Sequence, residues 1–209
     1  MGTAVNEEIV SGRDKVTQEI VARQFNTITL ENAMKAGPIN PEPGVYNYGP
    51  ADSFVNFGEK HDMFIVGHTL VWHNQTPDWF FQDEQGRPNT PEAQTERLRN
   101  HIKTVAGRYA GRVDAWDVVN EVFEGSGLRS TLFLSRMGTD YVSKLFTWAR
   151  EADPDVKLFY NDYNMEFETA KRNAMLNMVN NFQENDIPID GIGFQMHVNH
   201  DFPSRDAMT

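Results

Sequence analysis

The segment AWDVVNEVFEG (115–125) places Asn120 and Glu121 directly after a short apolar run. A carboxylate at the end of a buried strand is costly unless something compensates its charge. Glu121 could cap a helix or pair with a cation, or it could act as a general acid that protonates a leaving group. The residues at the other strand ends help to decide between these roles.

Other predicted strands end in a similar mixture of polar and aromatic residues. Amides, carboxylates and lysines hydrogen-bond hydroxyl groups, and aromatic rings can stack on the C–H faces of sugars. The residues concerned are Glu31, Asn32, Lys35, His68, Trp72, His73, Gln75, Trp79, Phe81, Phe123, Asn161, Asp162, Tyr163, Gln195 and His197. Trp148 falls within a helical stripe and is predicted to pack in the core. The set predicts a carbohydrate-binding cleft with Glu121 as its acid.

The histidines are poorly spaced for a shared metal site. His68 and His73 are five residues apart on one predicted strand, so they would point to opposite faces and could not share a metal by simple spacing. His197 and His200 form an HxxH pair, but no carboxylate cluster with ligand spacing accompanies them. Hydrogen bonding to sugar hydroxyls or to a carboxylate is the favoured role, and no cofactor is predicted.

Six short apolar runs predict strands that are buried on both faces of a parallel sheet. They are Gly2–Asn6, Phe25–Thr29, Met63–Trp72, Val113–Val119, Val156–Tyr160 and Ile189–His197. Between them, the clearest helix has Thr90 as its N-cap and Pro91 in its first turn, and it ends before Gly111. Further helices are predicted over 142–149 and 175–182, with weaker ones over 14–23 and 51–61.

Strands that alternate with helices predict βαβ units with right-handed crossovers. Six such units fit either an open doubly wound sheet or most of a (β/α)8 barrel. The nucleotide-binding motifs GxGxxG and GxxxxGK[ST] are absent from the sequence. Polar residues at the C-terminal ends of many strands are typical of a barrel active site. The predicted fold is therefore α/β, an incomplete (β/α)8 TIM barrel.

Composition excludes several classes of protein. The chain is 39% hydrophobic, as in an ordinary globular domain, and no run approaches the ~18 apolar residues of a membrane span. The N-terminus lacks the basic start and apolar run of a signal peptide. The absence of cysteine excludes disulfides and cysteine nucleophiles, and the net charge of −11 disfavours binding to nucleic-acid phosphates. Neither nucleic acid nor membrane is a predicted partner.

Five motifs resemble those of glycoside hydrolase family 10, the retaining endo-1,4-β-xylanases. In the family's order they are FNTITLENAMK (25–35), GHTLVWHNQTPDWF (67–80), AWDVVNEVFEG (115–125), LFYNDYN (158–164) and GIGFQMHVN (191–199). The resemblance implies that residues 1–209 are part of a (β/α)8 catalytic domain. It implies endo-hydrolysis of β-1,4-xylosidic bonds in xylan by double displacement, with xylan or xylo-oligosaccharide as partner. It also implies secretion.

The resemblance implies catalytic-centre roles for five residues. Glu121 is implied to be the general acid/base, and Asn120 to bond the 2-hydroxyl of the sugar at the cleavage site. Gln75 is implied to lie beside the acid/base. Gln195 and His197 are implied to touch the acid/base and the nucleophile.

The other matching residues are implied to bind substrate. They are Glu31, Asn32 and Lys35 on the glycone side, His68 and Trp72 around the scissile bond, and Tyr163 on the aglycone side. Crowding by Glu31 and Lys35 could reject glucose chains, since xylose lacks a hydroxymethyl group.

The family's nucleophile is a Glu in a Thr-Glu motif at the end of the seventh strand, and no strand of this sequence ends in that motif. Because FPSRDAMT occupies the place where the sixth helix should begin, we expect the natural protein to continue past Thr209. We also expect the first and sixth strands to be unpaired, which predicts instability or self-association.

Three functions stay open at this point. The first is a family 10 xylanase seen in part, and the second is a catalytically incomplete fragment that binds xylan. The third is a metal-dependent barrel hydrolase that uses His68, His197 and His200. An inverting enzyme that pairs Glu121 with Glu31 or Asp162 is a further alternative.

Overall fold

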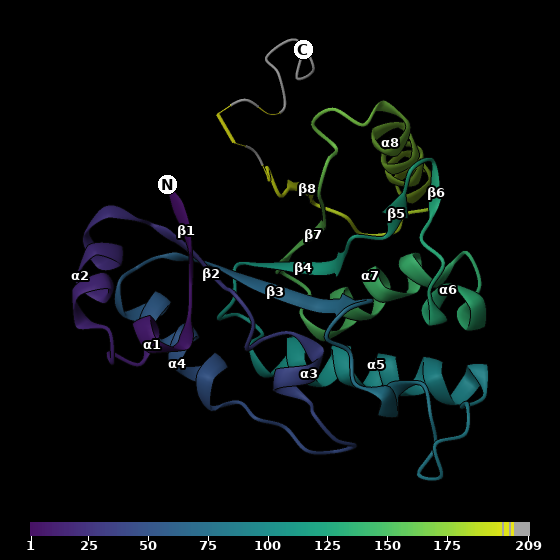
Figure 1. Cartoon of the computed structure of the whole chain (residues 1–209), viewed down its shortest axis with the longest axis horizontal. Helices are drawn as coiled ribbons and strands as arrows, with labels where there is room; N and C mark the ends of the chain where they lie inside the picture. The colour runs from purple at the N-terminus through teal and green to yellow at the C-terminus, as the bar shows by residue number, and fades with distance from the viewer. Residues whose placement is uncertain (198, 201, 203–209) are drawn as a thin grey trace.

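The computed structural model describes residues 1–197, 199, 200 and 202, and its central feature is one curled sheet of six parallel strands (Figure 1). The order across the sheet is β1-β2-β3-β4-β7-β8, so β1 and β8 are its edges. The strands are Gly2–Val5 (β1), Thr27–Leu30 (β2), Phe64–Trp72 (β3), Ala115–Asn120 (β4), Lys157–Asp162 (β7) and Gly191–Phe194 (β8). This arrangement confirms the prediction of an incomplete (β/α)8 barrel.

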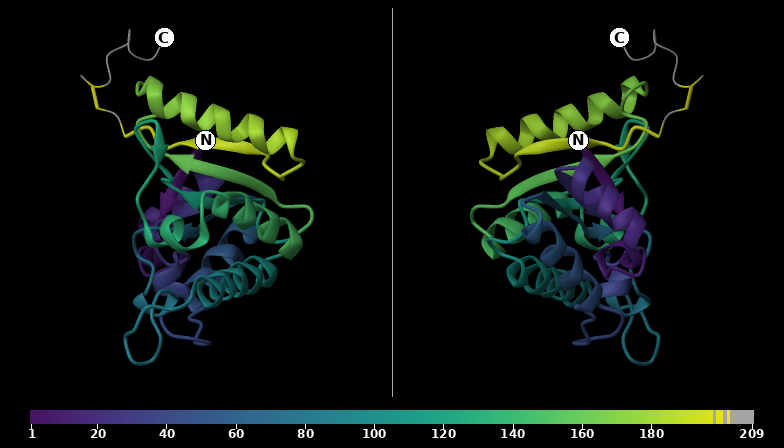
Figure 2. Two further views of the ribbon diagram at one scale, coloured as in Figure 1. Left: turned by 90° about the vertical axis from the view of Figure 1, so that its right-hand side faces the viewer. Right: turned by 90° about the vertical axis from the view of Figure 1, so that its left-hand side faces the viewer.

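The helices follow the strands along the chain and cover the outer side of the curl. The main ones are Lys15–Gln24 (α2), Gly49–Lys60 (α4), Pro91–Arg108 (α5), Tyr141–Ala152 (α7) and Thr169–Glu184 (α8). Helix α5 contacts β3 and α7 contacts β4, while α8 lies alongside β7 and β8 in Figure 2. Among the described residues, none of the helices is both long enough and apolar enough to cross a membrane.

Short elements that the sequence analysis missed fill the connections. They are Glu7–Val10 (α1), Ala36–Ile39 (α3), the 3₁₀ turn Asp78–Phe80 (η1), Leu132–Met137 (α6) and the hairpin of Phe123–Glu124 (β5) and Gly127–Leu128 (β6). None is longer than six residues, which is too short for a helical or alternating pattern to stand out from its surroundings.

The predicted element boundaries are mostly right and are corrected at two strands. Thr90 caps α5 as expected, because its hydroxyl accepts the Ala93 N–H at 3.2 Å. Phe25, predicted to begin a strand, instead caps the C-terminus of α2. The strand predicted over Ile189–His197 is only the four-residue β8.

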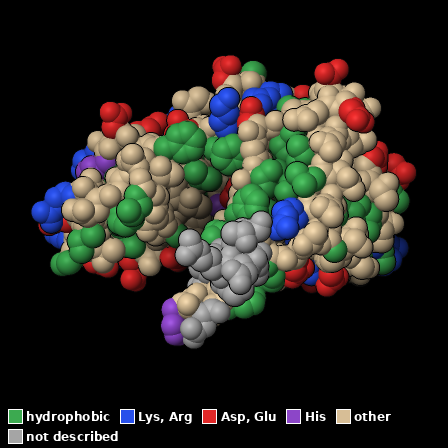
Figure 3. All heavy atoms as spheres, turned by 90° about the horizontal axis from the view of Figure 1, so that it is seen from above, with side chains coloured by type: hydrophobic (Ala, Val, Ile, Leu, Met, Phe, Trp, Pro, Cys, Tyr) green, Lys and Arg blue, Asp and Glu red, His purple; other side chains and the backbone are tan. Residues whose placement is uncertain are grey.

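Strand β4 lies at the centre of the core, and all six of its residues are buried. The indole of Trp116 fills the space over Gly67 of β3, where an added Cβ would lie 2.3 Å from the ring. Glycine is therefore required at this position because the aromatic ring takes the place of its side chain. Seen from above, hydrophobic side chains gather towards the middle of the surface and acidic ones spread around its periphery (Figure 3).

An ion pair is buried where β7 ends. The Lys171 ammonium lies 2.6 Å from an Asp162 carboxylate oxygen, and the two side chains are 2% and 0% exposed. The Asp162 carboxylate also accepts the Tyr163 N–H at 2.8 Å and the Tyr160 hydroxyl. Burial raises the pKa of the Tyr160 phenol, so it stays a hydrogen-bond donor. These partners compensate a carboxylate that would otherwise be too costly to bury.

We predict that Lys171→Met lowers the free energy of unfolding by about 3–5 kcal/mol, because it leaves the Asp162 charge buried without its cation. The matched control is Lys144→Met, which removes an exposed pair with Asp140 at 2.8 Å and should cost less than about 1 kcal/mol. Urea unfolding followed by circular dichroism measures both. Equal losses in the two variants would contradict the prediction.

Candidate active site

A pocket of about 530 Å³ opens at the C-terminal ends of the strands, a size within the usual range for small-molecule sites. Strands β1, β2, β3, β4 and β7 each contribute to it, as does the segment that follows β8. Its lining is Ala4, Thr29, Leu30, Glu31, Lys35, His68, Trp72, Asp117, Asn120, Glu121, Asn161, Gln195 and His197. The pocket thus brings together eight of the eleven predicted site residues. The most distant of them in the sequence, Glu31 and His197, are 166 positions apart.

Glu121 is the first residue after β4, and its backbone has left-handed geometry with φ of 60°. Its N–H donates to the Asn161 carbonyl at 2.9 Å, so the backbone turns while it is still bonded to β7. The Trp72 Nε1–H donates to one carboxylate oxygen at 2.9 Å, and the Gln195 Nε2–H donates to the other at 3.1 Å. Residues from β3 and from beyond β8 therefore hold the Glu121 carboxylate from two sides.

An amide network fixes the orientation of Asn120. Its Oδ1 accepts the side-chain amides of Asn161 at 2.9 Å and Gln195 at 3.0 Å. The Gln195 Oε1 in turn lies 2.7 Å from His197 Nε2, which must donate because Gln195 is an acceptor at that atom. The Asn120 Nδ2 is consequently the amide atom that remains for a ligand.

His68 pairs with Asp117 on the neighbouring strand. The two residues are opposite each other in the β3–β4 register, and Nδ1 lies 2.8 Å from the Asp117 carboxylate. An ionised carboxylate only accepts, so Nδ1 carries the proton and Nε2 is left for a ligand. Asp117 was not among the predicted site residues, although an acidic residue inside an apolar strand was a signal that could have found it.

Lys35 is nearly buried, at 8% exposure, and its ammonium has two neighbours, Asn32 and the Trp72 ring. Nζ donates to Asn32 Oδ1 at 2.9 Å and lies 4.7 Å from the centre of the Trp72 ring. Burial lowers the pKa of Lys35, and the nearby Glu121 and Glu31 charges oppose that shift. Asn32 therefore orients a cation of the site without lining the main pocket itself.

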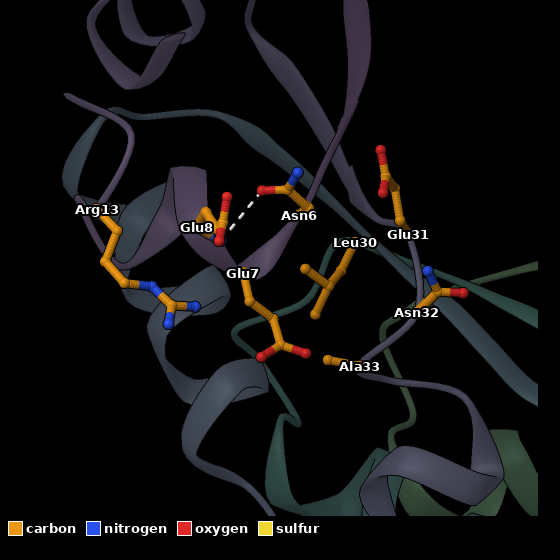
Figure 4. Close-up of a pocket in the computed structure, with 8 residues that line it drawn as sticks. All are labelled: Asn6, Glu7, Glu8, Arg13, Leu30, Glu31, Asn32 and Ala33. Carbon is orange, nitrogen blue, oxygen red and sulfur yellow. Dashed lines mark hydrogen bonds between the residues drawn. The ribbon is translucent and has the colours of Figure 1, made fainter. Parts of the chain in front are cut away.

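A second, smaller pocket of about 260 Å³ adjoins the first (Figure 4). Glu31 and Leu30 line both pockets. On one side of the smaller pocket are Asn6, Glu7, Glu8 and Arg13, and on the other are Asn32 and Ala33. Glu31 thus lies at the border between the two pockets.

Two other predicted site residues lie outside both pockets. Gln75 is exposed, with φ of 51°, and its carbonyl accepts the Gly37 N–H at 2.7 Å. The Tyr163 hydroxyl accepts an Arg129 N–H at 2.8 Å, and the Lys171 ammonium lies 3.6 Å from the centre of its ring. Arg129 was not identified from the sequence.

Several aromatic residues proposed for the cleft belong elsewhere. Phe81 and Phe123 are buried in the core, and the Trp79 indole donates to the Asn40 carbonyl at 3.2 Å. The Phe81 ring lies 5.1 Å from that of Phe133 and the Phe123 ring 5.8 Å from that of Tyr160, and position along the chain does not reveal such contacts. Trp148 is buried in α7, as predicted.

The histidines give no support for a metal centre among the described residues, which contain no group of three or more His, Cys, Asp or Glu that could hold an ion. His73 lies just after β3, whereas His68 lies within that strand. The prediction that the two histidines share one strand and point to its opposite faces is therefore wrong. Burial lowers the pKa of the His73 imidazole.

The sequence is similar to those of known xylanases. Endo-1,4-beta-xylanase A of Thermotoga maritima is 49% identical over 189 residues, covering 86% of this chain and 18% of the relative. Endo-1,4-beta-xylanase B of Thermotoga neapolitana is 46% identical over 183 residues, covering 87% and 52%. The chain thus spans about half or less of the length of these two curated relatives.

Solved structures agree with the sequence relatives. A GH10 endoxylanase from a sugarcane soil metagenome superposes with a TM-score of 0.94 at 45% identity, covering 99% of this chain and 60% of the other. A Thermoanaerobacterium saccharolyticum enzyme, described as an intracellular xylanase, gives 0.88 at 40% identity, covering 94% and 63%. Since this relative is described as intracellular, secretion of the present protein stays a prediction.

The family profile described as Glycosyl hydrolase family 10 matches residues 1–209, the whole chain. With this match and the two sequence relatives above 40% identity, the chain belongs to glycosyl hydrolase family 10.

Proposed function

We propose that the protein hydrolyses β-1,4-xylosidic bonds within xylan and that Glu121 is its general acid/base. The observation that carries the proposal is the Glu121 carboxylate in the main pocket, held at both oxygens by Trp72 and Gln195. Relatives from two Thermotoga species are named endo-1,4-beta-xylanases, and a solved neighbour holds xylobiose.

The two hydrogen bonds on Glu121 are compatible with acid and base steps. A carboxylate oxygen has two lone-pair directions, and each Glu121 oxygen uses one for an N–H donor. The other direction can hold a proton and deliver it to a leaving glycosidic oxygen. In the second half of the reaction, the same group would take a proton from the attacking water.

Sugar hydroxyls would be bound by groups whose other atoms are already occupied. Asn120 presents Nδ2, His68 presents Nε2, and Lys35 presents its ammonium beside the Trp72 ring. A polyhydroxylated ligand matches this set, since each hydroxyl can accept from one of these donors and donate to a carboxylate. Glu31 supplies such an acceptor at the border of the smaller pocket.

Double displacement also needs a carboxylate about 5–5.5 Å from the acid/base to attack the anomeric carbon. Besides Glu121, the carboxylates that line the main pocket among the described residues are those of Asp117 and Glu31. Asp117 is engaged by His68, and Glu31 matches a sugar-binding position of the family. We therefore propose that the nucleophile comes from outside these 209 residues, and that the 209-residue chain by itself binds xylo-oligosaccharide without turnover.

Hydrolysis by the 209-residue chain tests the missing nucleophile. We predict that it releases no more reducing sugar from xylan than its Glu121→Ala variant, because an acid without a nucleophile cannot form the glycosyl-enzyme intermediate. A reducing-sugar assay measures this. Release that Glu121→Ala abolishes would place both carboxylates within the chain, and release that a chelator abolishes would favour the metal-dependent alternative.

Binding tests the sugar site separately. We predict that the chain binds xylotriose and that Lys35→Met weakens binding about tenfold or more, because a hydrogen bond to a charged group contributes about 1.5–3 kcal/mol. Isothermal titration calorimetry measures the affinity, and Lys144→Met, on the exposed face of α7, serves as the control. Unchanged affinity in Lys35→Met, or no binding by the unmodified chain, would contradict the proposed site.

A further inference from the structure

Arg129 follows the β5–β6 hairpin, and its side chain makes contacts that reach the acid/base without entering the pocket. Its Nε–H donates to the Glu121 carbonyl at 3.3 Å, and its Nη2–H donates to the Tyr163 hydroxyl at 2.8 Å. The same Nη2 also lies 3.4 Å from the Phe123 carbonyl. The side chain is 17% exposed, so these contacts are largely shielded from water.

The Glu121 backbone needs such support. A side-chain-bearing residue at a φ of 60° is strained and persists only where its surroundings hold it. The Glu121 N–H is bonded to the Asn161 carbonyl, and its carbonyl is bonded to Arg129. The two halves of the left-handed residue are therefore fixed by different elements, β7 on one side and the Arg129 side chain on the other.

The planar guanidinium suits this position because one rigid group reaches two partners at once. Through Nε it holds the turn that carries Glu121, and through Nη2 it holds Tyr163, the residue just after β7. A lysine offers a single ammonium and cannot reproduce both bonds in the same geometry. The exposed Glu124, 3.5 Å from Nη1, is a weaker neighbour.

We propose that Arg129 is a positioning residue for Glu121, and that it ties the acid/base to Tyr163 as one unit. The catalytic meaning of this role rests on the proposed function of Glu121. The geometric role does not, because it concerns where the carboxylate lies and not what the carboxylate does.

The test uses the Trp72 indole as a reporter, since its N–H donates directly to the Glu121 carboxylate. The chain has four tryptophans, so a ¹H–¹⁵N spectrum shows four indole signals, and Trp72→Phe identifies the relevant one. In Arg129→Met we expect the Trp72 indole proton to shift upfield as the carboxylate moves away. We expect the Trp79, Trp116 and Trp148 signals to stay in place.

Arg136→Met is the matched control, because Arg136 also bonds backbone carbonyls, those of Phe81 at 3.3 Å and Asn89 at 2.6 Å, but does not bond Glu121. An unmoved Trp72 signal in Arg129→Met, or an equal shift in Arg136→Met, overturns the proposal. If Arg129→Met does not fold, Tyr163→Phe replaces it: a smaller upfield shift supports the link and no shift overturns it. Xylotriose titration is run separately, so failure to bind sugar contradicts the proposed function without changing the spectral result.

Discussion

Strand β4 contains no exposed residue, and its neighbours β3 and β7 cover both of its edges. Within the strand, the Asp117 carboxylate is engaged by His68, whereas Glu121, the first residue after the strand, places a second carboxylate in the same pocket. The left-handed turn at Glu121 directs the side chain into the pocket while the N–H remains bonded to β7. The position of the proposed acid/base therefore follows from how the most buried strand of the sheet ends.

The rest of the site is organised by the need to give every buried polar atom a partner. Asn120 has its oxygen occupied by two amide donors, His68 has Nδ1 occupied by Asp117, and Lys35 has its ammonium against Asn32. Asn120 and His68 each have one atom engaged by the protein and another left for a ligand, and the Lys35 ammonium has further N–H donors besides the one bonded to Asn32. Below this layer, the Asp162–Lys171 pair compensates the charge that β7 carries into the core.

The sequence was most informative where one local pattern determines the structure. Thr90 and Pro91 marked the start of α5, and the apolar runs located all six strands of the sheet, because caps and burial depend on near neighbours. It was least informative where side chains meet across the sheet. The pairing of Asp117 with His68 depends on the β3–β4 register. The contact of Arg129 with Glu121 depends on the β5–β6 hairpin, which brings the chain back towards the end of β4. Phe81 and Phe123 were misplaced because they pack against Phe133 and Tyr160, residues distant in the sequence, and composition does not predict such contacts.

The hydrogen bonds around Glu121 join β3, β4 and the segment after β8 through protein groups alone. Their arrangement is thus established during folding, and little conformational entropy remains to be lost when a ligand arrives. The same hydrogen bonds therefore contribute both to the local stability of the strand ends and to the affinity for a ligand. A substitution that loosens the strand ends would weaken binding even if it touches no ligand, and a bound ligand would in turn protect those strand ends from local opening.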